Sequence, residues 1–194
     1  MSTGYQIKDQ EALHYVTFQI VGWVDLFTRK VYRDIVIDNL RYCQQHKELE
    51  IHAFVVMSNH VHLMIRSNSG KLSDTIRDFK SYTSKQILKA IESEHESRRE
   101  WMLNIFEFAA KQHKRNAFYQ VWTHENHAEI IYSDKFLFQK MDYIHQNPVR
   151  AGIVEHPEEY LYSSARYLAD RPCVLDIVPV YVPTSKLPLM RTVK

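Results

Sequence analysis

The stretch Ile51-His-Ala-Phe-Val-Val-Met-Ser-Asn-His-Val-His-Leu-Met-Ile-Arg66 decides the fold. It contains two runs of mostly apolar and β-branched residues, 51–57 and 60–66, which are typical of strands. The dipeptide Ser58-Asn59 between them is typical of a turn. The sequence therefore predicts a β-hairpin at this point of the chain.

The returning strand of the hairpin carries two histidines. Side chains alternate between the faces of a strand, so His60 and His62 project from one face, and Val61, Leu63 and Ile65 project from the other. The apolar set can pack against helices, and the two imidazoles can converge on one metal ion. A His-x-His pair alone is more often part of a half-exposed strand that binds nothing.

Segments on either side of the hairpin complete a fold. β-branched and aromatic residues predict strands over 14–24 and 128–132. Apolar residues at helical spacing predict helices over 29–45, 73–91 and 135–146. This order is the split βαβ pattern of ferredoxin-like sheets with an extra helix at the end. We therefore predict an α+β fold, with helices packed on a ferredoxin-like or RRM-like antiparallel sheet.

Proline divides the chain into two parts. All six prolines lie at or beyond position 148, so regular structure is expected before it. The residue before a proline disfavours helical backbone, and Asn147-Pro148 is therefore predicted to end the last helix. We expect one domain over residues 1–165, with a charged helical insertion at 92–120, and a proline-rich appendage over 166–194.

Composition excludes several classes of protein. The chain is 45% hydrophobic, which is enough to build a core, and its formal net charge of +2 neither requires nor excludes a polyanionic partner. Two cysteines do not suggest a disulfide framework. The first residues lack the zones of a signal peptide, and no apolar run is long enough to cross a bilayer. We therefore expect a cytoplasmic protein with no membrane partner.

The last predicted helix carries a second group of polar residues. Tyr143 and Asn147 are four residues apart and share one helical face, and Lys140 falls within the same wedge. A phenol, an amide and an ammonium would thus lie on one surface. The same spacing is compatible with an ordinary packed helix that has Tyr143 at its amphipathic boundary.

The two groups together resemble a known family. The stretch from Val55 to Ile65, followed by Asp142-Tyr-Ile-His-Gln-Asn-Pro-Val-Arg-Ala-Gly-Ile-Val154, resembles the small single-tyrosine HUH transposases. Within that family the chain is most similar to the REP-associated tyrosine transposases. The resemblance spans about residues 14–165, in the expected order and spacing. It implies that residues 1–165 form an HUH transposase-like catalytic domain whose last helix carries the nucleophile.

The resemblance also implies a reaction and its residues. The nucleophile falls on Tyr143, and the metal ligands fall on His60, His62 and Asn147. The family uses Mg or Mn, nicks and rejoins single-stranded DNA, and forms a 5′-phosphotyrosine intermediate. Its DNA partners carry hairpins or palindromic repeat ends. A prokaryotic, nucleoid-associated location is implied, and a homodimer remains open.

Further residues are candidates for contact with DNA. They are basic or aromatic and lie on the insertion or the last helix: Lys111, Lys114, Arg115, Trp122, Lys140 and Arg150. Lysines could contact phosphates and aromatic rings could stack on unpaired bases. A solvated helix face and a set of core aromatics explain the same pattern equally well.

Two other functions are compatible with the sequence. A ferredoxin-like sheet can hold single-stranded nucleic acid without cutting it, as a domesticated transposase would. A pair of histidines can also serve a metal-dependent nuclease that uses water as its nucleophile. Only the transposase reaction leaves a covalent protein–DNA adduct.

Overall fold

The computed structural model describes residues 7–93, 95–112 and 118–180. At its centre is an antiparallel sheet in the order β2-β3-β1-β4. The strands are β1 (His14–Gln19), β2 (Leu49–Val56), β3 (His60–Ser67) and β4 (Glu129–Ile130). A ferredoxin-like sheet has this order, so the predicted α+β fold is confirmed.

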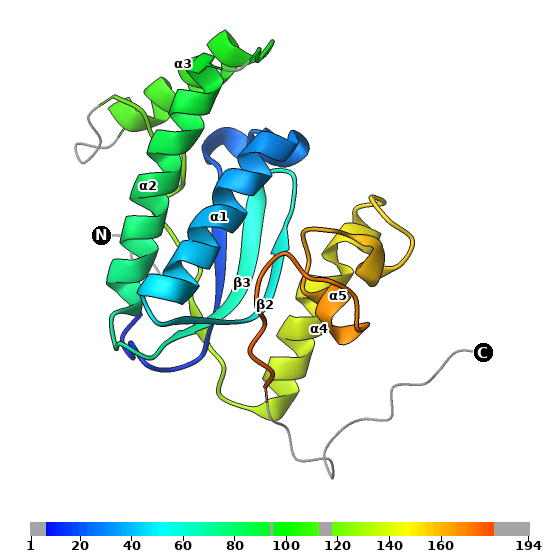
Figure 1. The fold of residues 1–194 in the computed structure, drawn as a ribbon. Helices are drawn as coiled ribbons and strands as arrows, with labels where there is room; N and C mark the ends of the chain where they lie inside the picture. The colour runs from blue at the N-terminus through cyan, green and yellow to red at the C-terminus, as the bar shows by residue number, and fades with distance from the viewer. Residues whose placement is uncertain (1–6, 94, 113–117, 181–194) are drawn as a thin grey trace.

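Two helices cover one face of the sheet. Helices α1 (Lys30–His46) and α2 (Leu72–Ser93) lie side by side across it (Figure 1). Phe18 of β1 packs against Phe79 of α2, with ring centroids 5.5 Å apart. Val61 on β3 is opposite Phe18 in the register and is fully buried. The alternation predicted for the hairpin thus places its apolar residues in the main core.

The opposite face is covered by α4 (Asp134–Arg150), which contacts β2 and β3. The helix begins at Ser133, whose hydroxyl accepts a hydrogen bond from the Phe136 amide. It does not end at Asn147, as the sequence predicted, but continues through Pro148. Proline removes one backbone donor, and here that loss falls in the last turn. The Ala151 amide still donates to the Asn147 carbonyl, so the turn closes around the missing bond.

The insertion contains a shorter helix than expected. Helix α3 (Arg99–Lys111) packs near η1 (Val21–Trp23), and η2 (Leu26–Thr28) leads on to α1. Glu96 connects the segment before α3 to the core through hydrogen bonds. Its carboxylate accepts hydrogen bonds from Arg29, Arg98 and Tyr32. Burial opposes the ionised form, but these donors outweigh it and lower the pKa of Glu96 to about 2.

The C-terminal part of the described chain runs along the outer edge of β2. It includes η3 (Pro157–Glu159) and α5 (Ala165–Leu168). The Val56 amide donates to the Tyr162 carbonyl, and the Ser164 amide donates to the Phe54 carbonyl. The Val178 amide donates to the Ile51 carbonyl further along. Residues on both sides of the predicted boundary at 165 therefore pair with the sheet.

A helix that crosses a bilayer is long and predominantly apolar. Among the described residues, no helix combines the length and the apolar character that crossing a membrane requires.

Candidate active site

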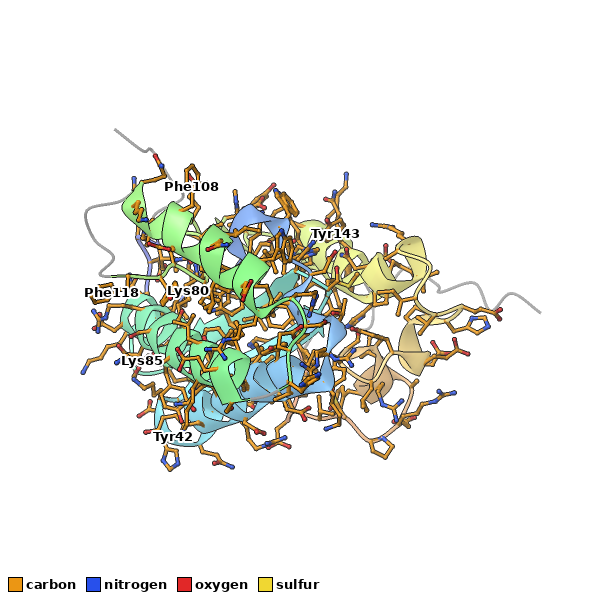
Figure 2. The ribbon with its side chains drawn as sticks, turned by 90° about the horizontal axis from the view of Figure 1, so that it is seen from above. Tyr42, Lys80, Lys85, Phe108, Phe118 and Tyr143 are labelled. Atoms are coloured by element: carbon orange, nitrogen blue, oxygen red, sulfur yellow. The ribbon has the colours of Figure 1, made fainter. Side chains whose placement is uncertain are left out.

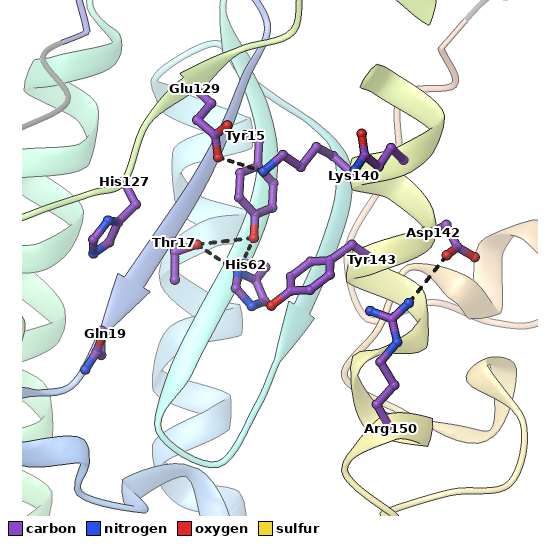
Figure 3. Close-up of a pocket in the computed structure, with 11 residues that line it drawn as sticks. Tyr15, Thr17, Gln19, His62, His127, Glu129, Lys140, Asp142, Tyr143 and Arg150 are labelled. Atoms are coloured by element: carbon purple, nitrogen blue, oxygen red, sulfur yellow. Dashed lines mark hydrogen bonds and ion pairs between the residues drawn. The ribbon is translucent and has the colours of Figure 1, made fainter. Parts of the chain in front are cut away.

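A pocket of about 560 Å³ lies between α4 and the sheet face that carries the histidines (Figure 3). It is lined by side chains from β1, β3, β4, the segment that enters β4, and α4: Tyr15, Thr17, Gln19, His62, His127, Glu129, Gln139, Lys140, Asp142, Tyr143 and Arg150. His62 from the first group singled out in the sequence and Lys140 and Tyr143 from the second therefore meet at one place, whereas His60 and Asn147 are not among the lining residues.

His62 is the most buried polar residue of this pocket, at 4% exposure. Its Nδ1 lies 2.8 Å from the Tyr15 hydroxyl and 2.8 Å from the Thr17 hydroxyl. Burial, with smaller contributions from His60 and Lys140, lowers the pKa of His62 to about 3. The ring is therefore neutral at physiological pH. Its Nε2 is buried without a hydrogen-bond partner in the described structure.

The tautomer of His60 follows from its neighbour Asn59. The Asn59 amide nitrogen faces two acceptors, the Trp23 carbonyl and an Asp25 carboxylate oxygen. Its Oδ1 must therefore be the atom that lies 2.8 Å from His60 Nδ1. Because Oδ1 can only accept, Nδ1 carries the proton and Nε2 keeps its lone pair. Burial lowers the pKa of His60 as well.

The two imidazoles form a pair suited to a divalent cation. Their ring centroids are 4.6 Å apart. Histidine ligands of metals commonly donate the other ring N–H to a neighbouring oxygen, as His60 does to Asn59. The hydroxyls beside His62 can accept in the same way. A metal ion would thus bind Nε2 of His62, which is buried without a hydrogen-bond partner in the described structure. His60 and His62 therefore fit such an ion.

Tyr143 projects from α4 toward this pair. Its ring centroid lies 5.3 Å from that of His62 and 6.4 Å from that of Tyr15. Figure 3 shows its hydroxyl end pointing toward His62. The residue is 39% exposed, so a substrate in solution can reach it.

Asn147 contacts its own helix and not the pocket. It lies one turn beyond Tyr143, and its Nδ2 donates to the Tyr143 carbonyl within the same helix at 2.7 Å. It is not among the residues that line the pocket. Among the described residues, no group of three or more His, Cys, Asp and Glu side chains is placed to hold a metal. A third protein ligand would therefore have to be an amide or another oxygen donor.

The charges of the pocket lining balance each other. Lys140 is paired with Glu129 at 2.6 Å, and Arg150 is paired with Asp142 at 3.7 Å. Both cations also contact rings: the Lys140 ammonium lies 4.2 Å from the Tyr15 centroid, and the Arg150 guanidinium carbon lies 5.5 Å from the Tyr143 centroid. Because each cation already has a carboxylate, a bound phosphate would need further positive charge.

The candidate DNA-contacting residues outside the pocket lie in different environments. Lys111 is exposed and paired with Glu107 on its own helix. Lys114 and Arg115 lie outside the described residues. Trp122 is only 4% exposed, and its indole nitrogen donates to the Thr83 hydroxyl, so it is a core residue and its ring cannot serve for base stacking.

Several pocket residues were missed in the sequence. Tyr15 and Thr17 reach His62 only because β1 pairs with β3, where Thr17 is directly opposite His62. His127 lines the pocket with a φ of 41°, a left-handed conformation that is uncommon for a residue with a side chain. The polar alternation of Tyr15, Thr17 and Gln19 along the first strand was the one available signal.

Comparisons with known proteins agree with this arrangement. A family model described as IS200-like transposase matches residues 23–112, a stretch that includes both histidines and ends before α4. No curated protein matches the chain.

Two solved structures are similar. One is a REP-associated tyrosine transposase bound to a REP hairpin: the TM-score is 0.56 and the identity 17%, over 98% of this chain and 99% of that chain. The other is a protein assigned as a transposase, from Deinococcus radiodurans R1, with a TM-score of 0.41 and 17% identity, over 74% of this chain and 94% of that chain. The first similarity shows that the fold is shared. Together with the match to the IS200-like transposase model, this shared fold confirms the resemblance predicted from the sequence.

Proposed function

We propose, from its similarity to the IS200-like transposases, that the chain nicks and rejoins single-stranded DNA through a covalent tyrosine intermediate. The observation that carries the proposal is the position of Tyr143, 5.3 Å from the ring of His62 and open to solvent. The fold shared with a hairpin-bound transposase supports a hairpin or palindromic repeat end as the DNA.

The reaction would exchange one phosphodiester for another. The Tyr143 oxygen attacks phosphorus, the bond from phosphorus to the 3′ oxygen breaks, and its electron pair leaves with that oxygen. The phenol loses a proton and the 3′ oxygen gains one. The products are a 5′-phosphotyrosine and a free 3′-OH. Because the number of phosphoester bonds is unchanged, attack by a 3′-OH can rejoin the strand without ATP.

Each residue of the site has a part in this proposal. His60, His62 and Asn147 would hold Mg or Mn, which when bound would supply the positive charge that the phosphate requires. Thr17 and Tyr15 orient His62. Lys140 and Arg150 flank Tyr143, and exchange of their carboxylate partners for phosphate oxygens would anchor the DNA backbone. We assign this activity to residues 1–165 and leave 166–194 outside the catalytic domain.

The test is covalent trapping. The protein is incubated with an end-labelled, hairpin-bearing single strand and Mn²⁺, and the products are run on a denaturing gel. We expect a protein–DNA adduct from the wild-type chain. Tyr143→Phe should abolish the adduct but keep DNA binding in a native gel. Tyr167→Phe is the matched control, because Tyr167 is also 39% exposed and lies on α5, and it should retain the adduct.

The same gel separates the alternatives. Cleaved DNA without an adduct would indicate a nuclease that uses water. Binding with neither cleavage nor adduct would indicate a nucleic-acid-binding module. An adduct that persists in Tyr143→Phe would remove Tyr143 as the nucleophile.

A further inference from the structure

A pair of stacked aromatic rings lies at the start of α4, and the reaction proposed above gives it no role. The Tyr132 and Phe136 ring centroids are 4.9 Å apart, and the ring planes are inclined by only 17°. Tyr132 is 78% exposed, so most of its ring is open to solvent. The pair is therefore a preformed surface with room for one more planar group.

Lys140, which lines the pocket, links this aromatic pair to it. The Lys140 ammonium lies 5.1 Å from the Phe136 centroid and 4.2 Å from the Tyr15 centroid. Tyr15 in turn is 6.4 Å from Tyr143, ring to ring. A path of rings with one ammonium among them thus leads from the nucleophile to solvent.

Exposed aromatic residues are common and need no function by themselves. Tyr42 is an example: it is 49% exposed and its ring lies against His46 of the same helix, with centroids 4.6 Å apart and the ring planes inclined by 42°. Figure 2 shows Tyr42 far from Tyr143, on the other side of the molecule. What distinguishes the Tyr132–Phe136 pair is its contact with the Lys140 ammonium, which lines the pocket of about 560 Å³.

We propose that Tyr132 and Phe136 form a stacking site for an unpaired base of the strand that Tyr143 attacks, a few nucleotides from the attacked phosphate. The proposal rests on the proposed function and specifies its substrate. Aromatic rings accept any base, because every base has a flat face, but a paired base inside a duplex has both faces covered. The site therefore selects single-stranded DNA beside the cleavage point, without selecting its sequence.

The first test measures binding in the Tyr143→Phe background, where no cleavage can interfere. The probe is a fluorescein-labelled oligothymidylate of roughly 20 nucleotides, longer than one binding site. Tyr132→Ala should weaken binding roughly 5- to 150-fold, the range known for loss of one base–aromatic stack. Tyr132→Phe keeps the ring and should bind as the parent does. Tyr42→Ala removes the matched ring elsewhere and should also leave affinity unchanged.

The second test changes the DNA instead of the protein. Abasic sites are placed one by one along the single-stranded flank of a hairpin-bearing oligonucleotide, in which the hairpin fixes the register of binding, and one position should weaken binding to the parent protein. The same abasic site should weaken binding to Tyr132→Ala much less, because the stack is already lost. Equal binding by Tyr132→Ala and its parent would overturn the proposal, as would an abasic scan with no sensitive position.

Sedimentation of the same variants completes the test. If Tyr132→Ala alters the oligomeric state and not the affinity for DNA, the pair is an interface between copies of the chain and the proposal is wrong. These readouts concern binding alone. Absence of a wild-type adduct would refute the proposed reaction without deciding the stacking site.

Discussion

The Thr17 hydroxyl lies 2.8 Å from Nδ1 of His62, across the β1–β3 pair. This contact, together with the Tyr15 hydroxyl, orients the imidazole so that Nε2 is directed away from both oxygens. The histidine that we propose as a metal ligand is thus held by a neighbouring strand that supplies none of the proposed ligands.

Removal of that hydroxyl should weaken metal binding. Thr17→Val keeps the shape of the side chain but not its oxygen, and loss of such an orienting partner typically costs about 10- to 100-fold in metal affinity. Mn²⁺ titration followed by electron paramagnetic resonance measures this without any DNA. Thr17→Ser should restore affinity, and Thr28→Val, at an exposed hydroxyl, should not change it. Unchanged Mn²⁺ affinity in Thr17→Val would show that the contact is merely structural.

The affinity for a metal ion should also depend only weakly on pH in the mildly acidic range. Metals bind neutral imidazole, and an ordinary histidine with a pKa of about 6.5 loses roughly tenfold in affinity by about pH 5.5. Burial lowers the pKa of His62 to about 3 and lowers that of His60 too, so protons compete only at lower pH. We expect Mn²⁺ affinity to fall by less than about tenfold per histidine between about pH 7.5 and about pH 5.5. A loss of tenfold or more per histidine would contradict the burial of the pair.

Lys80 should stabilise the fold and not contact DNA. Its ammonium donates to the Thr123 and Glu125 carbonyls and to the Asn126 side chain, and burial lowers its pKa to about 7. Lys80→Met leaves three acceptors without that donor and should cost roughly 2 kcal/mol of unfolding free energy. Urea denaturation measures the loss.

The control for this variant is Lys85→Met on the same helix, at an exposed position (Figure 2). It should change stability by less than about 0.5 kcal/mol. Equal stability of the two variants would show that the Lys80 contacts contribute nothing.

Glu96 should make the free energy of unfolding depend on pH. Its folded pKa is about 2, below that of the unfolded chain, so its contribution is present above about pH 4.5 and is lost as pH falls toward 2. Glu96→Gln leaves Arg29 and Arg98 without their carboxylate and should cost about 3 kcal/mol at neutral pH. The difference in unfolding free energy between Glu96→Gln and the wild-type chain should be smaller at about pH 3 than at neutral pH, as measured by urea denaturation. Glu92→Gln, at an exposed position, should show no such pH-dependent difference.

Local patterns predicted most of the fold. The alternation around His60 and the helical spacing around Tyr143 both depend on neighbours in the sequence, and the structure has both elements. The prediction that Asn147-Pro148 ends the helix was wrong. A proline in the last turn removes only one backbone hydrogen bond, and the Ala151 amide still donates to the Asn147 carbonyl. Tyr15, Thr17 and the burial of Lys80 depend on contacts between segments far apart in the chain, which no local pattern encodes.

The C-terminal segment that runs along β2 also limits how copies of the chain can associate. With that edge occupied and β4 only two residues long, the described part of the sheet offers no long free strand to another molecule. Self-association would therefore have to use helices or loops and not a continuous intermolecular sheet. Truncation before residue 160 would uncover the β2 backbone and create an aggregation-prone edge.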